Sequence, residues 1–178
     1  ILAYLFENGG QLCREAFWHA RKHIECLQYL IDAGIPWPFR YAHMLARENN
    51  LSTLKYVLAR GCPLNDHVLC NVQIVECVQI IHGVGFVFTE HSSVCAAQTT
   101  VEIMRILREL GCPWSVATTA AAARSGNLDI LTYLHEEGCE WNQHCIAGAI
   151  NHNHLNCLVY AHEHGCPAPT LVTYYAAA

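Results

Sequence analysis

The sequence predicts an all-α fold, a right-handed solenoid of stacked helix-turn-helix units, and three observations carry that prediction. A glycine recurs every 24 to 27 residues, at Gly9, Gly34, Gly61, Gly85, Gly111, Gly138 and Gly165. Apolar residues stand at fixed distances before these glycines, and each interval holds two helix-like stretches separated by a short break. Such a period is typical of arrays in which each unit buries its apolar face against its neighbours.

The apolar positions lie on one face of the second helix of each unit. Seven residues before the glycine, from Gly34 onward, the chain has Leu27, Leu54, Val78, Met104, Leu131 and Leu158. Ten residues before it stand Ile24, Leu51, Val75, Val101, Leu128 and Leu155. Together with apolar residues five and four positions before the glycine, they form one broad helical face, which we expect to be buried. The glycine then serves as a left-handed C-terminal cap.

These intervals divide the chain into a single repeat domain, residues 1–178. We expect a partial repeat at 1–9, repeats at 10–37, 38–64, 65–88, 89–114, 115–141 and 142–168, and a partial repeat at 169–178. The chain begins without methionine in the back half of a unit, so we expect it to be a piece of a longer protein.

Taken in order, the first helices of the units are expected over Cys13–Arg21, Tyr41–Glu48, Ser92–Gln98, Val116–Arg124 and Gln143–Asn151. The second helices follow over the apolar stripes, as at 24–33 and 51–60. The unit at 65–88 is the shortest and least regular, with Gly83-Val84-Gly85 in place of a clean helix end. We expect the array to bend or loosen there.

The stretch AAARSGNLDILTYLHEEG, residues 121–138, resembles the second half of an ankyrin repeat. The tails after Gly61 and Gly111, Gly-Cys-Pro-Leu and Gly-Cys-Pro-Trp, resemble the short ankyrin-like repeats of protists and large DNA viruses. The resemblance implies stacked helix pairs and a protein partner. The units are about six residues shorter than the roughly 33 of ordinary ankyrin repeats, so we expect reduced or absent β-hairpin fingers.

Composition narrows the classes of partner. The chain is 53% hydrophobic and only 14% charged, with a net charge of −5 and scattered Lys and Arg, so we expect no nucleic-acid partner. No apolar run approaches the roughly 18 residues that span a bilayer, so we expect no membrane insertion. Eleven cysteines in a periodic helical chain do not suit a disulfide scaffold. We therefore expect an intracellular protein in a reducing compartment, most simply the cytoplasm.

The cysteines and twelve histidines also raise the question of zinc. The densest run is Cys157, His162, His164 and Cys166, but His162 and His164 face different sides of a helix. His19 and His23 lie one turn apart without a placed partner, and no Cys-x2-Cys pair exists. We therefore predict no metal site. A zinc-binding or thiol-sensing protein remains the alternative function.

Catalytic motifs are missing from the sequence. It has no Gly-x-Ser-x-Gly elbow and no glycine-rich phosphate loop. We expect no enzyme activity, no cofactor and no small-molecule substrate.

What remains is a non-catalytic protein–protein interaction module, an adaptor or a structural subunit of a larger assembly. In stacks of the ankyrin type the first helices line a concave face. The positions there that core packing does not determine are predicted to contact the partner: Phe17, Arg21, Met44, Arg47, Glu48, Val94, Gln98, Arg124, Ser125, Asn151 and His152.

Overall fold

The computed structural model describes residues 14–168. The predicted partial repeats at 1–9 and 169–178 lie outside the described residues, as do the first residues of the unit at 10–37. Within 14–168 the chain forms eleven α-helices and one 3₁₀ helix, with no β-strand. The predicted all-α fold is therefore confirmed.

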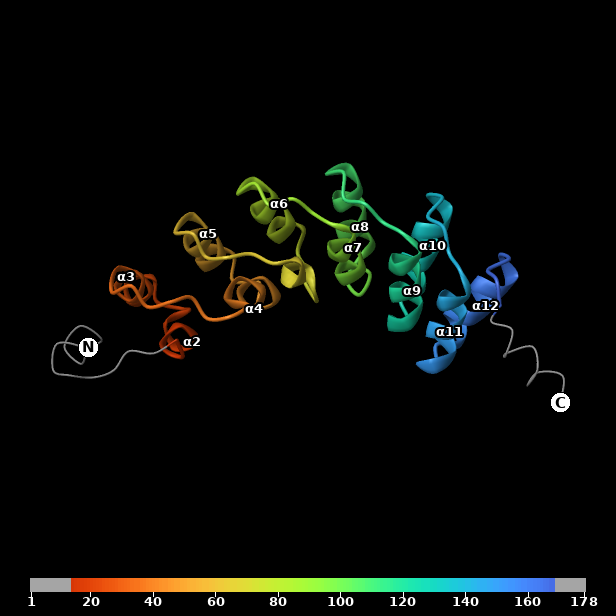
Figure 1. The fold of residues 1–178 in the computed structure, drawn as a ribbon, viewed down its shortest axis with the longest axis horizontal. Coiled ribbons are helices and arrows are strands. Elements are labelled where there is room, and N and C mark those ends of the chain that lie inside the picture. The colour runs from red at the N-terminus through yellow and green to blue at the C-terminus, as the bar shows by residue number, and fades with distance from the viewer. Residues whose placement is uncertain (1–13, 169–178) are drawn as a thin grey trace.

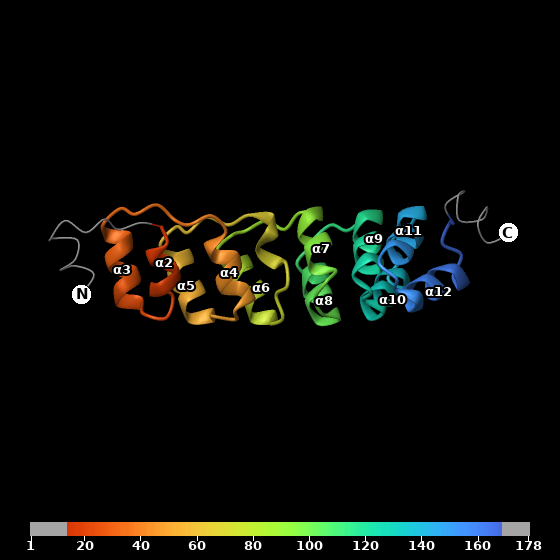
Figure 2. The ribbon, with the colours of Figure 1, turned by 90° about the horizontal axis from the view of Figure 1, so that it is seen from below.

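The helices stand in two rows that follow an arch (Figure 1). The inner row, on the concave side, consists of α2 (Ala16–Ala20), α4 (Tyr41–Arg47), η1 (Asp66–Leu69), α7 (Glu90–Ala96), α9 (Val116–Ser125) and α11 (Gln143–Asn151). The outer row consists of α3 (Ile24–Asp32), α5 (Leu51–Ala59), α6 (Val75–Gly83), α8 (Val101–Glu109), α10 (Leu128–Glu136) and α12 (Leu155–Glu163). Figure 2 shows the array from below, with the connections from outer to next inner helices along one edge.

The outer helices bury most of the predicted stripe. Leu27, Leu54, Val78, Met104 and Leu131 are all at most 1% exposed. The position ten residues before the glycine behaves differently, since Ile24 is 44% and Leu155 65% exposed. The prediction of a buried stripe was wrong at these two residues, whereas Leu51, Val75, Val101 and Leu128 are partly buried against the core. This residue begins each outer helix, at the rim of the core rather than within it.

Residues with a left-handed backbone conformation mark the helix ends and the turns between helices. Every closing glycine in the described range has a positive φ, as at Gly138 (77°). The turn from inner to outer helix uses a second left-handed residue, which is Gly126 in one unit and Asn49, Asn71 or Asn153 in others. Asparagine tolerates this conformation better than most residues.

The cysteine after the closing glycine is buried and has a hydrogen-bonding role. The Cys112, Cys139 and Cys166 thiols donate to the carbonyls of Thr89, Ser115 and Asn142, at 3.4, 3.5 and 3.3 Å. Each acceptor is the N-cap residue of the preceding inner helix. A small side chain that also donates one hydrogen bond therefore recurs at this site.

The unit at 65–88 is irregular, as predicted, because its inner element is only the four-residue 3₁₀ helix η1. In the following unit the inner helix spans Glu90–Ala96, not Ser92–Gln98. The shift arises because Thr89 and Ser92 form a reciprocal capping box that starts the helix two residues early.

Candidate functional site

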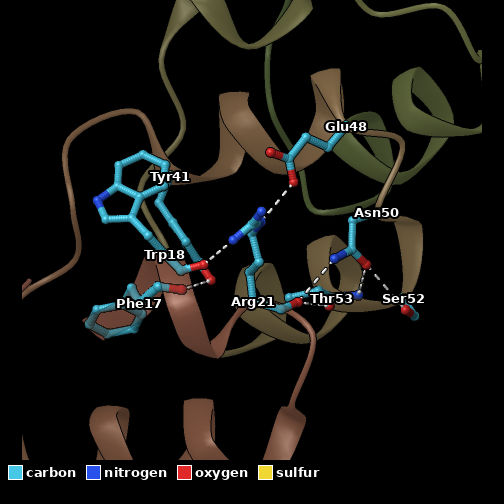
Figure 3. A network of polar contacts seen from close by, with 8 residues as sticks. All are labelled: Phe17, Trp18, Arg21, Tyr41, Glu48, Asn50, Ser52 and Thr53. Carbon is cyan, nitrogen blue, oxygen red and sulfur yellow. Dashed lines mark hydrogen bonds and ion pairs between the residues drawn. The ribbon is translucent and has the colours of Figure 1, made fainter. Parts of the chain in front are cut away.

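Arg21, one of the predicted contact residues, is held by its own neighbours (Figure 3). Its Nε donates to Glu48 Oε2 at 3.0 Å, and its guanidinium also donates to the Trp18 carbonyl. Its backbone carbonyl accepts from Asn50 Nδ2 and Thr53 Oγ1, both at 3.0 Å. The predicted residues Arg21 and Glu48 thus pair with each other and connect α2 to the unit of α4 and α5.

Phe17 and Met44 are not available on the concave surface. Phe17 is fully buried, with its ring 5.1 Å from that of Trp37 and 5.4 Å from that of Tyr41. Met44 is 7% exposed. Both were predicted to contact a partner, but large apolar side chains on these short helices fill the space between the two rows instead.

A groove of about 610 Å³ lies over α7, α9 and α11, and it brings together four predicted residues: Val94, Arg124, Asn151 and His152. Arg47 and Gln98 are exposed but do not line it. Ser125 is exposed, yet its hydroxyl donates to the carbonyls of Ala97 and Ala122, at 3.3 and 3.0 Å. The predicted face is therefore only partly one site.

The floor of the groove consists of small residues that sequence reasoning missed, among them Ala117, Ala120 and Ala147. Gly148 allows α11 to approach α9 closely, since an added Cβ would stand 3.2 Å from the Ala120 carbonyl oxygen. The missed residues look like ordinary helix formers, and only the packing of α11 on α9 exposes them to a common space.

Arg124 provides the positive charge of the groove. Its side chain is exposed, and in the part of the chain that the structure describes it forms no ion pair. His144 and His152 line the same groove, and no carboxylate does. The groove therefore offers hydrogen-bond donors and one unpaired cation above an apolar floor.

A second cluster lies on the inner row, between η1 and α7. His91 Nε2 is 3.2 Å from His67 Nδ1, which is 3.9 Å from Cys95 Sγ and 4.0 Å from Cys70 Sγ. The ligand atoms of His67, His91 and Cys95 all lie within 4.8 Å of one another. Cys70 lies beside this group but is not one of its members.

The two thiols of this cluster differ in acidity. The hydrogen bond from Cys95, and to a lesser extent His67, lowers the pKa of Cys70 to about 6 although burial opposes the shift. The pKa of Cys95 is raised, because the same hydrogen bond and its burial favour its protonated form. The pair therefore holds a thiolate on Cys70 more easily than two separate thiols would.

This cluster is not the one singled out in the sequence. Within residues 14–168, Cys157, His162, His164 and Cys166 do not form a comparable group of converging ligand atoms. Two signals could have found the right residues: the spacings His67-x2-Cys70 and His91-x3-Cys95, and the recurrence of histidine every 24 residues at His43, His67 and His91. Both spacings are mixed pairs of one histidine and one cysteine, whereas the expected zinc motifs pair like residues.

Comparisons with models of known protein families and with curated proteins each gave no match. Within the described residues, none of the helices combines the length and apolar character that crossing a bilayer requires.

Proposed function

We propose that the chain is an ankyrin-like solenoid that binds another protein without catalysis, as an adaptor or as a structural subunit of a larger assembly. The observation that carries the proposal is the groove over α7, α9 and α11, where small side chains form an apolar floor beside an unpaired Arg124. The recurrent Gly-Cys tails and the hydrogen bonds from one unit to the next support the repeat interpretation.

The chemistry of the groove favours a particular partner segment. Its floor of alanine and glycine leaves room for the side chains of an incoming helix or extended strand. A carboxylate on that segment would pair with Arg124 in a partly desolvated setting, where a charge-assisted hydrogen bond is stronger than at an open surface. We therefore propose an acidic protein segment as the occupant.

The ten cysteines in the described range are free thiols, and most are buried. This supports an intracellular, reducing compartment as part of the proposal.

Selection of displayed random peptides against the whole chain tests the proposal. We expect enriched peptides to share a carboxylate, and we expect Arg124→Glu to weaken their binding by at least about tenfold. Arg47→Glu is the matched control, because Arg47 is an exposed arginine of the inner row outside the groove. Equal affinity for both variants, or enrichment of peptides without acidic residues, would contradict the proposal.

A further inference from the structure

We propose that His67, Cys70, His91 and Cys95 bind one zinc ion, which joins η1 to α7. The proposal is independent of the groove, because none of these four residues lines it. It rests on the spacing within each element, on the distances between ligand atoms and on the contacts that hold the ligands.

Each element presents its two ligands at its own helical period. His67 and Cys70 are three residues apart at the end of a 3₁₀ helix, in which residues i and i+3 eclipse. His91 and Cys95 are four residues apart on an α-helix, where residues i and i+4 share a face. Two such elements placed side by side can present four ligands to one ion.

The distances suit a tetrahedral zinc ion. With Zn–N near 2.1 Å and Zn–S near 2.3 Å, tetrahedral ligands lie about 3.4 Å apart for two nitrogens and about 3.6 Å apart for nitrogen and sulfur. The structure has 3.2 Å between the two histidine nitrogens and 3.9 to 4.0 Å from His67 Nδ1 to the two sulfurs. His67, His91 and Cys95 are thus close to the arrangement around one ion, and Cys70 Sγ, 4.0 Å from His67 Nδ1, would move inward to complete the sphere.

Charge and protons balance for this ion. Two thiols each lose a proton to solvent as their sulfurs bind Zn²⁺, and the two imidazoles bind as neutral ligands, so the site carries no net charge. Two S–H bonds therefore break and two Zn–S bonds form. A Cys₂His₂ set of this kind favours zinc over hard cations such as Mg²⁺ and Ca²⁺.

Neighbouring groups hold His67 in place. Its backbone N–H donates to Asn65 Oδ1 at 3.1 Å, and its carbonyl accepts from His43 Nδ1 at 2.6 Å. Beside the cluster, Thr89 Oγ1 donates to Asp66 Oδ1 at 3.1 Å and so connects the start of α7 to η1. The ligands therefore stand on elements already fixed to each other, which lowers the cost of forming the site.

The location gives the ion a structural role. The element η1 is the shortest of the described inner row, and an ion shared with α7 would add to the contacts that already hold these two elements together. His91 is exposed while Cys95 is 4% exposed, so the ion would reach the site from the concave side and rest on the core.

Titration of the reduced, metal-free whole chain with Co²⁺ tests the site. We expect one equivalent to bind with the intense visible absorption of tetrahedral thiolate-bound Co²⁺, and Zn²⁺ to displace it. At free Zn²⁺ near 100 times Kd, Tm should rise by about 5–10 °C. Cys95→Ser and His91→Ala should each weaken binding by more than the 10–100-fold typical of losing an outer-shell partner.

Two control variants remove similar residues elsewhere. Cys157→Ser removes a thiol of α12 that is as deeply buried, and His144→Ala removes the histidine at the matching position of α11. Both should bind Co²⁺ like the unchanged chain. His91→Ala keeps the test valid if Cys95→Ser fails to fold, because His91 is exposed. The proposal is overturned by an octahedral Co²⁺ spectrum, by equal binding in His91→Ala, or by a Cys70–Cys95 disulfide in protein isolated without oxidants.

Discussion

In the two units from residue 115 to 168, the inner helices α9 and α11 have ten and nine residues and pack closely over small side chains. In the unit at 65–88 the inner element is the four-residue η1, and polar and sulfur-bearing side chains gather between it and α7. The first region gains its order from helix packing. The second has less helix to pack, and its side chains converge in a pattern suited to a metal ion.

The pKa of one thiol, Cys70, shifts in the opposite direction to the pKa values of the packed cysteines, which include Cys77 in the unit at 65–88 and Cys139. Burial raises the pKa of Cys112 and of Cys139 to about 11, because nothing near them stabilises a thiolate as strongly as burial disfavours it. The pKa of Cys70 is instead lowered by the Cys95 thiol. The groups around each thiol therefore decide the direction of its pKa shift.

The largest effect that separates the regions should come from Leu131→Ala. This side chain is fully buried in α10, so its truncation should lower the free energy of unfolding by about 2–5 kcal/mol, with or without Zn²⁺. Leu69→Ala, in η1, should also destabilise and in addition weaken Co²⁺ binding. Leu155→Ala, at a 65% exposed position, is the control and should change stability by less than about 0.5 kcal/mol. Urea unfolding measures all three, and similar losses for Leu131→Ala and Leu155→Ala would contradict the assigned core.

The next effect is alkaline destabilisation. Burial raises the pKa of Cys62 to about 12 and of Cys77, Cys112 and Cys139 to about 11, against an ordinary value of 9.0. The pKa of each thiol is higher in the folded state than in the unfolded state. The stability that this difference contributes is therefore fully present below pH 9 and is lost as pH rises toward 11 to 12. Each such thiol should lower the unfolding free energy by about 1.4 kcal/mol per pH unit in that window.

Urea unfolding at pH 8, 9 and 10 under a reductant measures this slope. Cys112→Ala removes one of these thiols, so stability should fall less steeply with pH, by the contribution of that one thiol. If the free energy of unfolding did not change between pH 8 and 10, the buried thiols would not contribute to its pH dependence.

Gly126→Ala should lower the free energy of unfolding by about 1–3 kcal/mol, because it adds strain to the turn between α9 and α10. Gly126 has φ of 73°, and an added Cβ would overlap the His154 ring. The double variant Gly126→Ala with His154→Ala removes the overlap and leaves only the strain of the left-handed backbone. We expect it to recover part of the loss in thermal unfolding, whereas no recovery would mean that the ring does not restrict this site.

The smallest effect concerns the caps. Asn127 Oδ1 accepts from the Ile130 backbone N–H at 3.2 Å, and Asn127 Nδ2 donates to the Thr99 carbonyl at 3.0 Å. Asn127→Ala removes both bonds and should lower the free energy of unfolding by about 1 kcal/mol. Ile74, at the same place before α6, makes no side-chain cap. Ile74→Ala should therefore leave the helix start unaffected. Hydrogen exchange at the first amides of α10 and α6 distinguishes the two, and equal exchange rates in the Asn127→Ala and unchanged chains would contradict the cap.

Much of the architecture could be read from local patterns. The predicted helix bounds 116–124 and 143–151 agree with the structure to within one residue. The structure adds the N-caps Ser115 and Asn142, residue types that favour a helix start. The candidate site was predicted less well. Phe17 was assigned to a contact surface, although an exposed and a buried position of a short inner helix look alike in sequence.

The sequence by itself determined the period, the helix pairs, the capping residues and the apolar stripe, because these depend on residues within one turn or one unit of each other. Only the tertiary structure decided which side chains from different units meet. The closeness of α11 to α9 creates the groove, and the 3₁₀ geometry of η1 brings His67 and Cys70 to His91 and Cys95. Such contacts depend on how each unit is rotated against the next, and no local pattern encodes that rotation.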